Sequence, residues 1–441
     1  MTSGDLTRWL EDARWRPGPG VSRARLRERV AALRTALAAA PLARKAGRRK
    51  ALFALALDGP VPDHLLKVER YAGASLPRRL GRGGAAQELA RAAASAARGV
   101  PTPLPLAAGA VRRGGRLEAT FLLVPLVADA VDLARAWEGG RAPRRLRRAV
   151  AGALGAAIRV LHDAGIDQDD LAPNNFLWRE GPEPRVLVID FERVRVGRRV
   201  APARRALALA RLDRHLAGAS ASDRMRLLRG YAGGHARAWW RAVAAAHARL
   251  AARDFAHLLR TGTRASRRFA PVASPGFRGW ARREGPLPAA LAALDTPGAA
   301  TGLWITALGA PAEPERVWAA ALVLAQRAAA PPPVALLCRG GACFLVAERV
   351  SGARPFAGAP SEGAALAGLL SRLLAFGFEP SALACDALVL APGPAGGLYA
   401  QLLDPRGLRP GQVRRAGPDA RAWAARLLAG GVPPPQKTLP R

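Results

Sequence analysis

The chain has 441 residues, with 68 Lys+Arg against 33 Asp+Glu, a formal charge of +35 and 50% hydrophobic residues. The apolar half excludes a disordered polyelectrolyte, and the length predicts two or three domains. Three cysteines exclude a disulfide framework, and their spacing matches no zinc motif, so we expect a reducing compartment. Asp5, Glu11 and Asp12 interrupt the start where a signal peptide needs an apolar core, and no run of about 18 uncharged apolar residues predicts a membrane span.

The basic charge is almost entirely arginine. Only four of the 68 basic residues are lysines, as expected of a GC-rich coding sequence, which favours Arg, Ala, Gly and Pro together. A basic chain associates with polyanions such as nucleic acid, acidic lipid or phosphorylated glycan. The chain lacks the regular basic and aromatic alternation of single-strand binders, and Trp239-Trp240 is better explained as packing. We therefore do not expect nucleic acid as the partner.

Hydrophobic periodicity predicts a helix, two strands, a second helix and two more strands in the first part of the chain. The predicted ranges are 24–40, 50–59, 64–71, 85–99, 105–111 and 117–127.

Farther along, a helix over 144–164 leads into the polar loop IDQDDLAPNN and then into FLW. A buried strand follows at 186–190, and arginine-rich helical sequence fills 200–260. This order of elements predicts an α+β fold of two lobes.

The segment 162–192 carries the strongest chemical signal. Asp170 is followed five residues later by Asn175 and twenty later by Asp190, which ends an apolar strand and precedes Phe191. This is the protein-kinase spacing of a catalytic-loop Asp, a loop Asn and a metal-binding Asp. Phosphoryl transfer needs one carboxylate to accept the proton of the attacking hydroxyl, and hard oxygen ligands for Mg²⁺. Asp170 fits the first role, and Asn175 and Asp190 fit the second.

Two upstream residues complete the set. Lys67 lies in a predicted strand, where a lysine pairs with the α- and β-phosphates of the nucleotide. Glu88 lies in the following helix and is placed to hold Lys67 by an ion pair. Alone, a lysine and a glutamate about twenty residues apart are weak evidence, because Glu88 could be a solvated helix residue and Lys67 could snorkel from a strand edge. Five residues in this order, with matching strand and helix contexts, predict a kinase site that binds ATP.

These motifs resemble the bacterial lipopolysaccharide kinase family, the kinases of Kdo and core heptose, over residues 40–255. The resemblance lies in HLLKVERY, QELARAAASAARGVPTPLPL, FLLVPLVADAVDL, LHDAGIDQDDLAPNNFL and VLVIDFERVR. It implies a protein-kinase-like fold, ATP and Mg²⁺ as cofactors, and a sugar hydroxyl of a lipid-anchored glycan as acceptor. It also implies a cytoplasmic enzyme, with peripheral association at the inner face of the inner membrane.

The chain departs from the kinase pattern at three places. Gln168-Asp169 replaces the usual His-Arg before the catalytic Asp, Glu192 replaces the D-F-G glycine, and no GxGxxG precedes Lys67. We expect the first two changes to affect positioning, and the missing glycine loop to affect nucleotide affinity. The basic segment AGRRK at 46–50 is a candidate substitute for contacts to phosphates.

The second half resembles a degenerate copy of the first. A shift of 212 residues aligns 164–177 with 376–389 without a gap. In that register Asp170 becomes Ala382 and Asn175 becomes Ala387, while LLDPRGLR at 402–409 stands where VIDFERVR stood and sets Asp404 against Asp190. We therefore expect a two-lobed, duplicated fold with an N-terminal helical segment, a catalytic domain and a pseudokinase domain. The expected ranges are 1–39, 40–258 and 259–441.

The leading hypothesis is an ATP-dependent phosphotransferase acting on Kdo or heptose of the lipopolysaccharide core, or on a related anionic glycolipid. Two alternatives stay open. One is a non-catalytic, nucleotide-binding regulatory pseudokinase, which the altered catalytic loop and the missing glycine loop favour. The other is a kinase acting on a protein or on another small molecule such as an aminocyclitol, because the same catalytic residues serve either acceptor.

Overall fold

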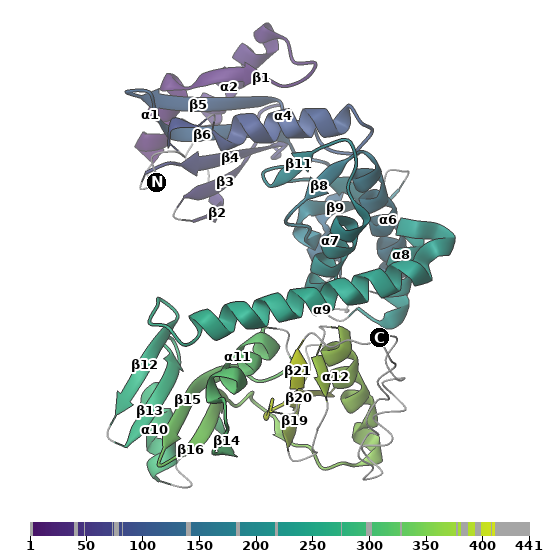
Figure 1. The fold of residues 1–441 in the computed structure, drawn as a ribbon. Coiled ribbons are helices and arrows are strands. Elements are labelled where there is room, and N and C mark those ends of the chain that lie inside the picture. Colours follow the sequence, from purple (N-terminus) through teal and green to yellow (C-terminus); the bar gives the residue numbers. More distant parts are fainter. Residues whose placement is uncertain are drawn as a thin grey trace. The chain divides into compact units, whose positions relative to one another are not determined.

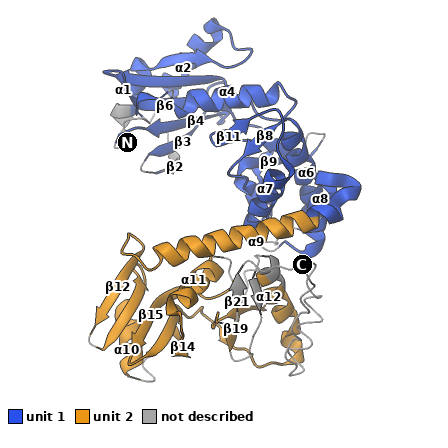
Figure 2. Ribbon diagram, viewed as in Figure 1, with its two compact units in different colours: residues 1–239 blue, residues 240–441 orange. Residues whose placement is uncertain are grey.

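The computed structural model places the chain in two compact units, Met1–Trp239 and Trp240–Arg441 (Figures 1 and 2). It describes residues 3–410 apart from short internal segments. These are 39–42, 48, 73, 75–78, 82, 138–142, 182–185, 217–218, 275, 297–301, 327–328, 376–377, 381–386, 393–397 and 407. The division at 239/240 falls inside one helix, α9 (Ala236–Thr261), whereas the sequence placed a boundary at 258/259. The domain ranges stay a prediction.

The first unit begins with an antiparallel sheet of six strands in the order β1-β5-β6-β4-β3-β2 (Figure 1). The strands are β1 (Arg14–Pro17), β2 (Ala43–Ala46), β3 (Lys50–Leu55), β4 (His64–Arg70), β5 (Ala107–Arg113) and β6 (Arg116–Pro125). Strands β3 to β6 confirm the four strands that the sequence predicted. Strand β1 was not predicted, and it pairs antiparallel with β5.

Each face of this sheet is covered by helices because the strand residues alternate. Phe121 and Leu123 of β6 belong to a buried cluster with residues of α1 (Ser3–Asp12) and α2 (Arg23–Ala38). Leu122, which points the opposite way, packs instead in a cluster with Ala85 of α4 (Gly84–Ala96). The predicted helices at 24–40 and 85–99 are thereby confirmed.

The rest of the first unit is mainly helical, with short strands around the predicted catalytic loop. The helices are α5 (Leu133–Trp137), α6 (Arg144–Asp163), the 3-10 helix η2 (Pro173–Asn175), α7 (Pro202–His215), α8 (Ala221–Ala232), the 3-10 helix η3 (Gly233–His235) and the start of α9. The strands are β7 (Ala130–Asp132), β8 (Ile166–Gln168), β9 (Phe176–Arg179), β10 (Val186–Val188) and β11 (Val194–Val196).

Helices α6 and α8 approach each other at the level of their backbones. A Cβ on Gly155 would lie 2.0 Å from the carbonyl oxygen of Leu227, and a Cβ on Gly230 would lie 2.2 Å from that of Gly152. No real Cβ tolerates such contacts, so the crossing needs glycine at both positions. The α6 helix, which leads directly into the catalytic loop, is fixed by this packing.

The mixed sheet and helix content, with a sheet followed by a helical part, agrees with the predicted α+β, kinase-like fold of the first unit. Among the described residues, no helix is long and apolar enough to cross a membrane.

The second unit holds a five-stranded sheet in the order β12-β13-β15-β16-β14, with smaller sheets β17-β19-β20 and β18-β21. Its large sheet consists of β12 (Phe269–Ser274), β13 (Phe277–Arg282), β14 (Leu303–Gly309), β15 (Pro333–Arg339) and β16 (Ala342–Glu348). The other strands are β17 (Arg354–Pro355), β18 (Phe378–Pro380), β19 (Leu388–Pro392), β20 (Leu398–Leu402) and β21 (Leu408–Pro410). The helices after α9 are α10 (Leu287–Asp295), α11 (Pro314–Ala325), the 3-10 helix η4 (Pro360–Glu362) and α12 (Gly363–Ala375).

The duplication is not confirmed. Of the aligned positions, Ala387 and Asp404 are described, and Ala382 lies outside the described residues.

Cys338 and Cys343 stand opposite each other on β15 and β16 and are joined by a disulfide. This single bond was not predicted, because the sequence led us to expect a reducing compartment. Cys343 is buried in the core of the second unit, and Cys338 packs against that core. Cys385 lies outside the described residues.

Candidate active site

Lys67 and Glu88 form an ion pair between β4 and α4. Lys67 stands opposite Leu122 in the sheet, so its side chain lies on the face that α4 covers. Its Nζ donates to both carboxylate oxygens of Glu88, at 2.8 and 3.1 Å. Glu88 is only 7% exposed. The structure therefore brings together the two residues that the sequence separated by 21 positions.

Burial and neighbouring charges shift the pKa values of both residues of this pair. Burial alone would lower the pKa of Lys67, but the carboxylates of Glu88, Asp190 and Glu192 outweigh it and raise that pKa. Burial raises the pKa of Glu88 above its ordinary value, and Lys67 opposes this effect. Lys67 is thus firmly cationic, as a residue that grips phosphates must be.

Two more carboxylates reach the same lysine. Asp190 Oδ1 lies 3.6 Å and Glu192 Oε2 lies 3.7 Å from Lys67 Nζ. Glu192 also pairs with Lys50 of β3, and Arg91 of α4 donates to the backbone carbonyl of Glu192. Burial would raise the pKa of Glu192, but its hydrogen bond to Lys50 and the charges of the two lysines lower it. The sheet, α4 and the segment after β10 therefore meet at one point.

Asp190 has an unusual backbone conformation. Its φ of 63° is one of two positive values at described residues other than glycine. Such a conformation costs about 1–3 kcal/mol and persists where neighbours impose it. Here Gln168 Nε2 donates to the carbonyl of Asp190 at 3.0 Å, and Ile189 N donates to the carbonyl of Asn175 at 2.9 Å. The conformation turns the Asp190 carboxylate toward Lys67.

Asp170 and Asn175 lie in the loop between β8 and β9. Asn175 Nδ2 donates to the backbone carbonyl of Asp170 at 2.6 Å, and this bond closes the loop. The Asp170 side chain is 58% exposed, with Arg193 Nη1 at 3.7 Å from Oδ2. Its carboxylate is thus accessible to a substrate hydroxyl while its backbone is fixed.

An ion-pair network, which we call the Asp169 network, holds the start of this loop. Asp169 accepts from Arg195 at 2.8 and 2.9 Å and from Arg204 at 2.6 Å. Arg211 Nη1 donates to the Asp169 carbonyl at 2.8 Å, and Arg204 also pairs with Asp167. The arginines come from β11 and α7. A carboxylate now stands where protein kinases usually have the arginine of His-Arg-Asp, with the opposing charge supplied from these two elements.

The five predicted site residues are therefore linked by contacts, and their catalytic roles stay predictions. Lys67, Glu88 and Asp190 are in direct contact, and the backbone bonds of Ile189 and Gln168 tie them to the Asp170–Asn175 loop. Sequence reasoning missed the contacts of Glu192 with both lysines. An acidic residue directly after Asp-Phe was visible in the sequence, but it does not identify the lysines as its partners.

The oxygen atoms around Asp190 fit a divalent cation. Carboxylate oxygens of Glu88, Asp190 and Glu192 lie within 4.8 Å of one another. Asn175 donates through Nδ2 to the Asp170 carbonyl, and this bond does not use Oδ1, the amide atom that can ligate a cation. Hard oxygen ligands of this kind suit Mg²⁺.

The cavity beside Lys67 is small. It measures about 10 Å³ and is bounded by Lys67, Glu88, Thr120, Leu122 and Glu192 among others. In this state side chains occupy the space next to the lysine, with the Glu88 carboxylate 2.8 Å and the Glu192 carboxylate 3.7 Å from Lys67 Nζ.

Residues 68–231 match the family model of the lipopolysaccharide kinase (Kdo/WaaP) family. Over these residues the chain is similar to lipopolysaccharide kinases. The matched segment includes Glu88, Asp170, Asn175 and Asp190 and begins one residue after Lys67. The match confirms the resemblance predicted from the sequence and supports a kinase that uses ATP.

A solved structure of WaaP in complex with acyl carrier protein is 23% identical to this chain, with a TM-score of 0.37. The similarity covers 48% of this chain and 87% of that one. A comparison with curated proteins found no match.

Proposed function

We propose that this chain transfers the γ-phosphoryl group of ATP to a sugar hydroxyl of the lipopolysaccharide core, Kdo or heptose, or of a related anionic glycolipid. The observation that carries the proposal is the position of Lys67, which is paired with Glu88 at 2.8 Å and has Asp190 at 3.6 Å. A lysine between a helix glutamate and a metal-binding aspartate is the arrangement that phosphoryl transfer requires. The match to the lipopolysaccharide kinase family supports the acceptor class.

In the proposed reaction Asp170 is the catalytic base. Its accessible carboxylate takes the proton of the attacking sugar hydroxyl as the new oxygen–phosphorus bond forms and the bond between the γ-phosphorus and the β–γ bridging oxygen breaks. ADP leaves with the bridging oxygen. The proton passes from Asp170 to solvent after the phosphorylated sugar departs.

The other four residues position the donor. Lys67 binds the α- and β-phosphates, and Glu88 keeps its ammonium group in place. Asn175 and Asp190 are the proposed ligands of Mg²⁺, which when bound neutralises charge on the phosphates. Glu192 leaves Lys67 when the nucleotide arrives, because the phosphates carry the charge that Glu192 supplies in its absence.

The acceptor also suits the charge of the chain. A formal charge of +35 is attracted to an anionic leaflet and to a phosphorylated glycan. We therefore propose peripheral association with the inner face of the inner membrane as the working location.

A second candidate function is a non-catalytic, nucleotide-binding regulator. The specific observation that favours it is Glu192, which pairs with Lys50 and Lys67 beside a cavity of only about 10 Å³. In this hypothesis the carboxylate competes permanently with the nucleotide phosphates.

The deciding experiment measures transfer from γ-labelled ATP into lipopolysaccharide and into Kdo–lipid A, with the native chain, Asp170→Ala and Glu180→Gln. Glu180 is exposed, and no ion-pair partner stands near it in the described part of the unit, so its variant is the control. We expect transfer by the native chain and by Glu180→Gln, with a loss of at least about 100-fold in Asp170→Ala. Full activity of Asp170→Ala would show that the base is assigned wrongly. Magnesium-dependent ATP binding without transfer to either glycan would favour the regulator.

A further inference from the structure

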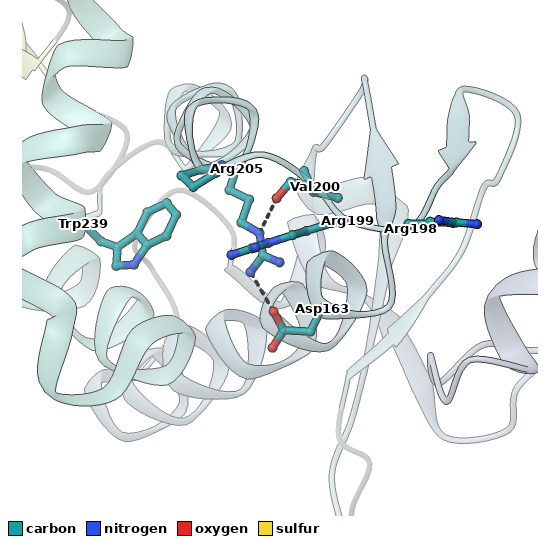
Figure 3. Close-up of a pocket in the computed structure, with 7 residues that line it drawn as sticks. Asp163, Arg198, Arg199, Val200, Arg205 and Trp239 are labelled. Atoms are coloured by element: carbon teal, nitrogen blue, oxygen red, sulfur yellow. Dashed lines mark hydrogen bonds and ion pairs between the residues drawn. The ribbon is translucent and has the colours of Figure 1, made fainter.

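A second and larger cavity lies in the first unit, at the beginning of α7 (Figure 3). Its volume is about 440 Å³, which falls within the usual range for small-ligand sites. The residues around it include Asp163, Arg198, Arg199, Val200, Arg205 and Trp239. They come from the end of α6, the segment after β11, and the first turns of α7 and α9.

One wall of this cavity is a fixed polar group. Arg205 donates through Nε to the carbonyl of Val200 at 2.9 Å, and through Nη1 to Asp163 at 2.6 Å, the bonds drawn in Figure 3. Its Nη2 donates to the carbonyl of His162 at 3.1 Å. Because Asp163 balances its charge, Arg205 offers an oriented hydrogen-bonding surface instead of a free cation.

A second wall is aromatic. Trp239 is half-buried, and in Figure 3 its ring lies across the cavity from Arg205. The ring meets Tyr231 edge-on, with centroids 4.9 Å apart, and the Tyr231 hydroxyl lies 3.0 Å from His162 Nδ1. The indole is therefore held in place. Its open face is an apolar surface with a negative quadrupole, against which the C–H face of a sugar ring packs well.

The free charge of the cavity comes from Arg199. Arg198 also lines the cavity, but in Figure 3 its guanidinium points away from Trp239 and Arg205. Arg199 is exposed, and the described residues offer it neither an ion pair nor a hydrogen bond. Because Asp163 balances the charge of Arg205, the Arg199 guanidinium supplies the positive charge that can attract an anion at the rim of the cavity. Guanidinium groups bind phosphate and carboxylate through paired hydrogen bonds.

We propose that this cavity binds an anionic sugar of the acceptor glycan, with the ring on Trp239 and the phosphate or carboxylate on Arg199. The proposal depends on the proposed function for the identity of the ligand. The cavity is separate from the phosphoryl-transfer site but adjoins the same helix turn, because Arg204 faces Asp167 and Asp169 while Arg205 faces the cavity. An extended glycan held here by one residue presents a neighbouring sugar to the catalytic loop.

Calorimetric titration of the full chain without ATP tests the binding. The probes are glucose 6-phosphate, glucuronate, inorganic phosphate and glucose. We expect glucose 6-phosphate, glucuronate or both to bind, inorganic phosphate to bind more weakly, and glucose not to bind. Arg199→Gln should weaken binding of the anionic sugar about tenfold or more, because a charge-assisted contact is lost. Preference for the phosphate or the carboxylate probe tells which anion the cavity selects.

Trp239 separates a sugar site from a bare anion site. Trp239→Ala should weaken glucose 6-phosphate binding but leave inorganic phosphate unchanged, and Trp239→Phe, which keeps an aromatic face, should lie between. Arg237→Gln and Trp240→Ala are the matched controls on the same helix, outside the cavity lining, and should bind as the native chain does. Equal affinities for Arg199→Gln and Arg237→Gln would overturn the proposal. So would an affinity for glucose 6-phosphate that does not depend on Trp239.

Kinetics keep this inference distinct from the proposed function. If the chain transfers phosphate to lipopolysaccharide, Arg199→Gln should raise KM for that acceptor about tenfold with KM for ATP unchanged. Transfer with an unchanged acceptor KM would overturn the cavity assignment and leave the kinase standing. Binding of anionic sugars that needs Arg199, in a chain that transfers phosphate to no glycan, would support the cavity and overturn the kinase.

Discussion

The Asp169 network gives the most specific test of how the catalytic loop is held. Asp169→Asn keeps the size of the side chain and removes its charge. In the native chain that charge faces Arg195 at 2.8 Å and Arg204 at 2.6 Å, with Arg211 at 3.7 Å. After substitution three guanidinium groups surround a neutral amide. We expect the catalytic loop to be held less firmly and the free energy of unfolding to fall.

The size of the effect follows from exposure. The Asp169 side chain is 41% exposed, so solvent screens its charge and each ion pair contributes only about 0.2–1 kcal/mol. Two hydrogen-bonded pairs therefore predict a loss of about 0.4–2 kcal/mol at neutral pH. For a unit of this size, each kcal/mol lowers Tm by about 2–4 °C.

The pH dependence has a definite sign. Burial would raise the pKa of Asp169, but its hydrogen bond to Arg204 and the charge of Arg195 lower it below its ordinary value. A depressed carboxyl pKa contributes stability above the unfolded value, about 3.9, and loses it as pH falls through the lower folded pKa. The difference between the native chain and Asp169→Asn should therefore be full at pH 7 and shrink below about pH 4.

The assay is thermal unfolding of the full chain, followed by circular dichroism between pH 3 and pH 7, together with kcat and KM for ATP. We expect Asp169→Asn to lower Tm and kcat with little change in KM for ATP, and Glu180→Gln to behave as the native chain. The reasoning is refuted if both variants share one Tm, or if the gap stays constant on acidification.

Three further predictions follow from residues described above. Lys67→Met should abolish phosphate transfer and weaken MgATP binding in a chain that still folds, as measured by single-turnover transfer and calorimetry; normal ATP affinity would contradict its role. Gly155→Ala should lower the urea midpoint by the equivalent of about 1–3 kcal/mol, because the new Cβ would lie 2.0 Å from the carbonyl oxygen of Leu227. Gly152→Ala on the same helix is the control, because its Cβ would have no atom within 4 Å and should not destabilise the chain. Burial and then the charge of Arg205 lower the pKa of His162 to about 4 in the folded chain, so the histidine takes up a proton when the chain unfolds in mild acid. The free energy of unfolding should therefore fall by up to about 3 kcal/mol from pH 6.5 to pH 4. If the urea midpoint of His162→Gln depends on pH as steeply as that of the native chain, this assignment is wrong.

Much of the active site could be predicted because its residues carry their chemistry in the sequence itself. Lys67 lies in an alternating strand and Glu88 in a helix. The hydrophobic periodicity of each segment, together with the residue type, is enough to place them. Asp170, Asn175 and Asp190 keep a spacing that one kind of chemistry requires. The structure brings these residues into one connected set of contacts.

The rest could not be predicted, because it depends on contacts between distant segments. Nothing local in Glu192 indicates that it faces Lys50, 142 positions earlier. In the sequence Asp169 is only a replacement of the usual arginine. The arginines of β11 and α7 that pair with it are known only from the structure. Strand β1 has the sequence RWRP, with mostly exposed residues, and lacks the alternation that identifies a strand. The residue pattern of one segment does not show which distant segment it contacts in the fold.

The pairing of β1 with β5 bears on how this protein can be cut for study. A shorter chain that starts at residue 40 would lose β1, α1 and α2 together. The hydrogen-bonding edge of β5 would then be open, and Phe121 would lose Trp15, which stacks on it with ring centroids 5.7 Å apart. An uncovered, apolar edge strand invites pairing with another copy. We expect fragments trimmed to the matched kinase segment to self-associate, and recombinant work should keep the first residues attached.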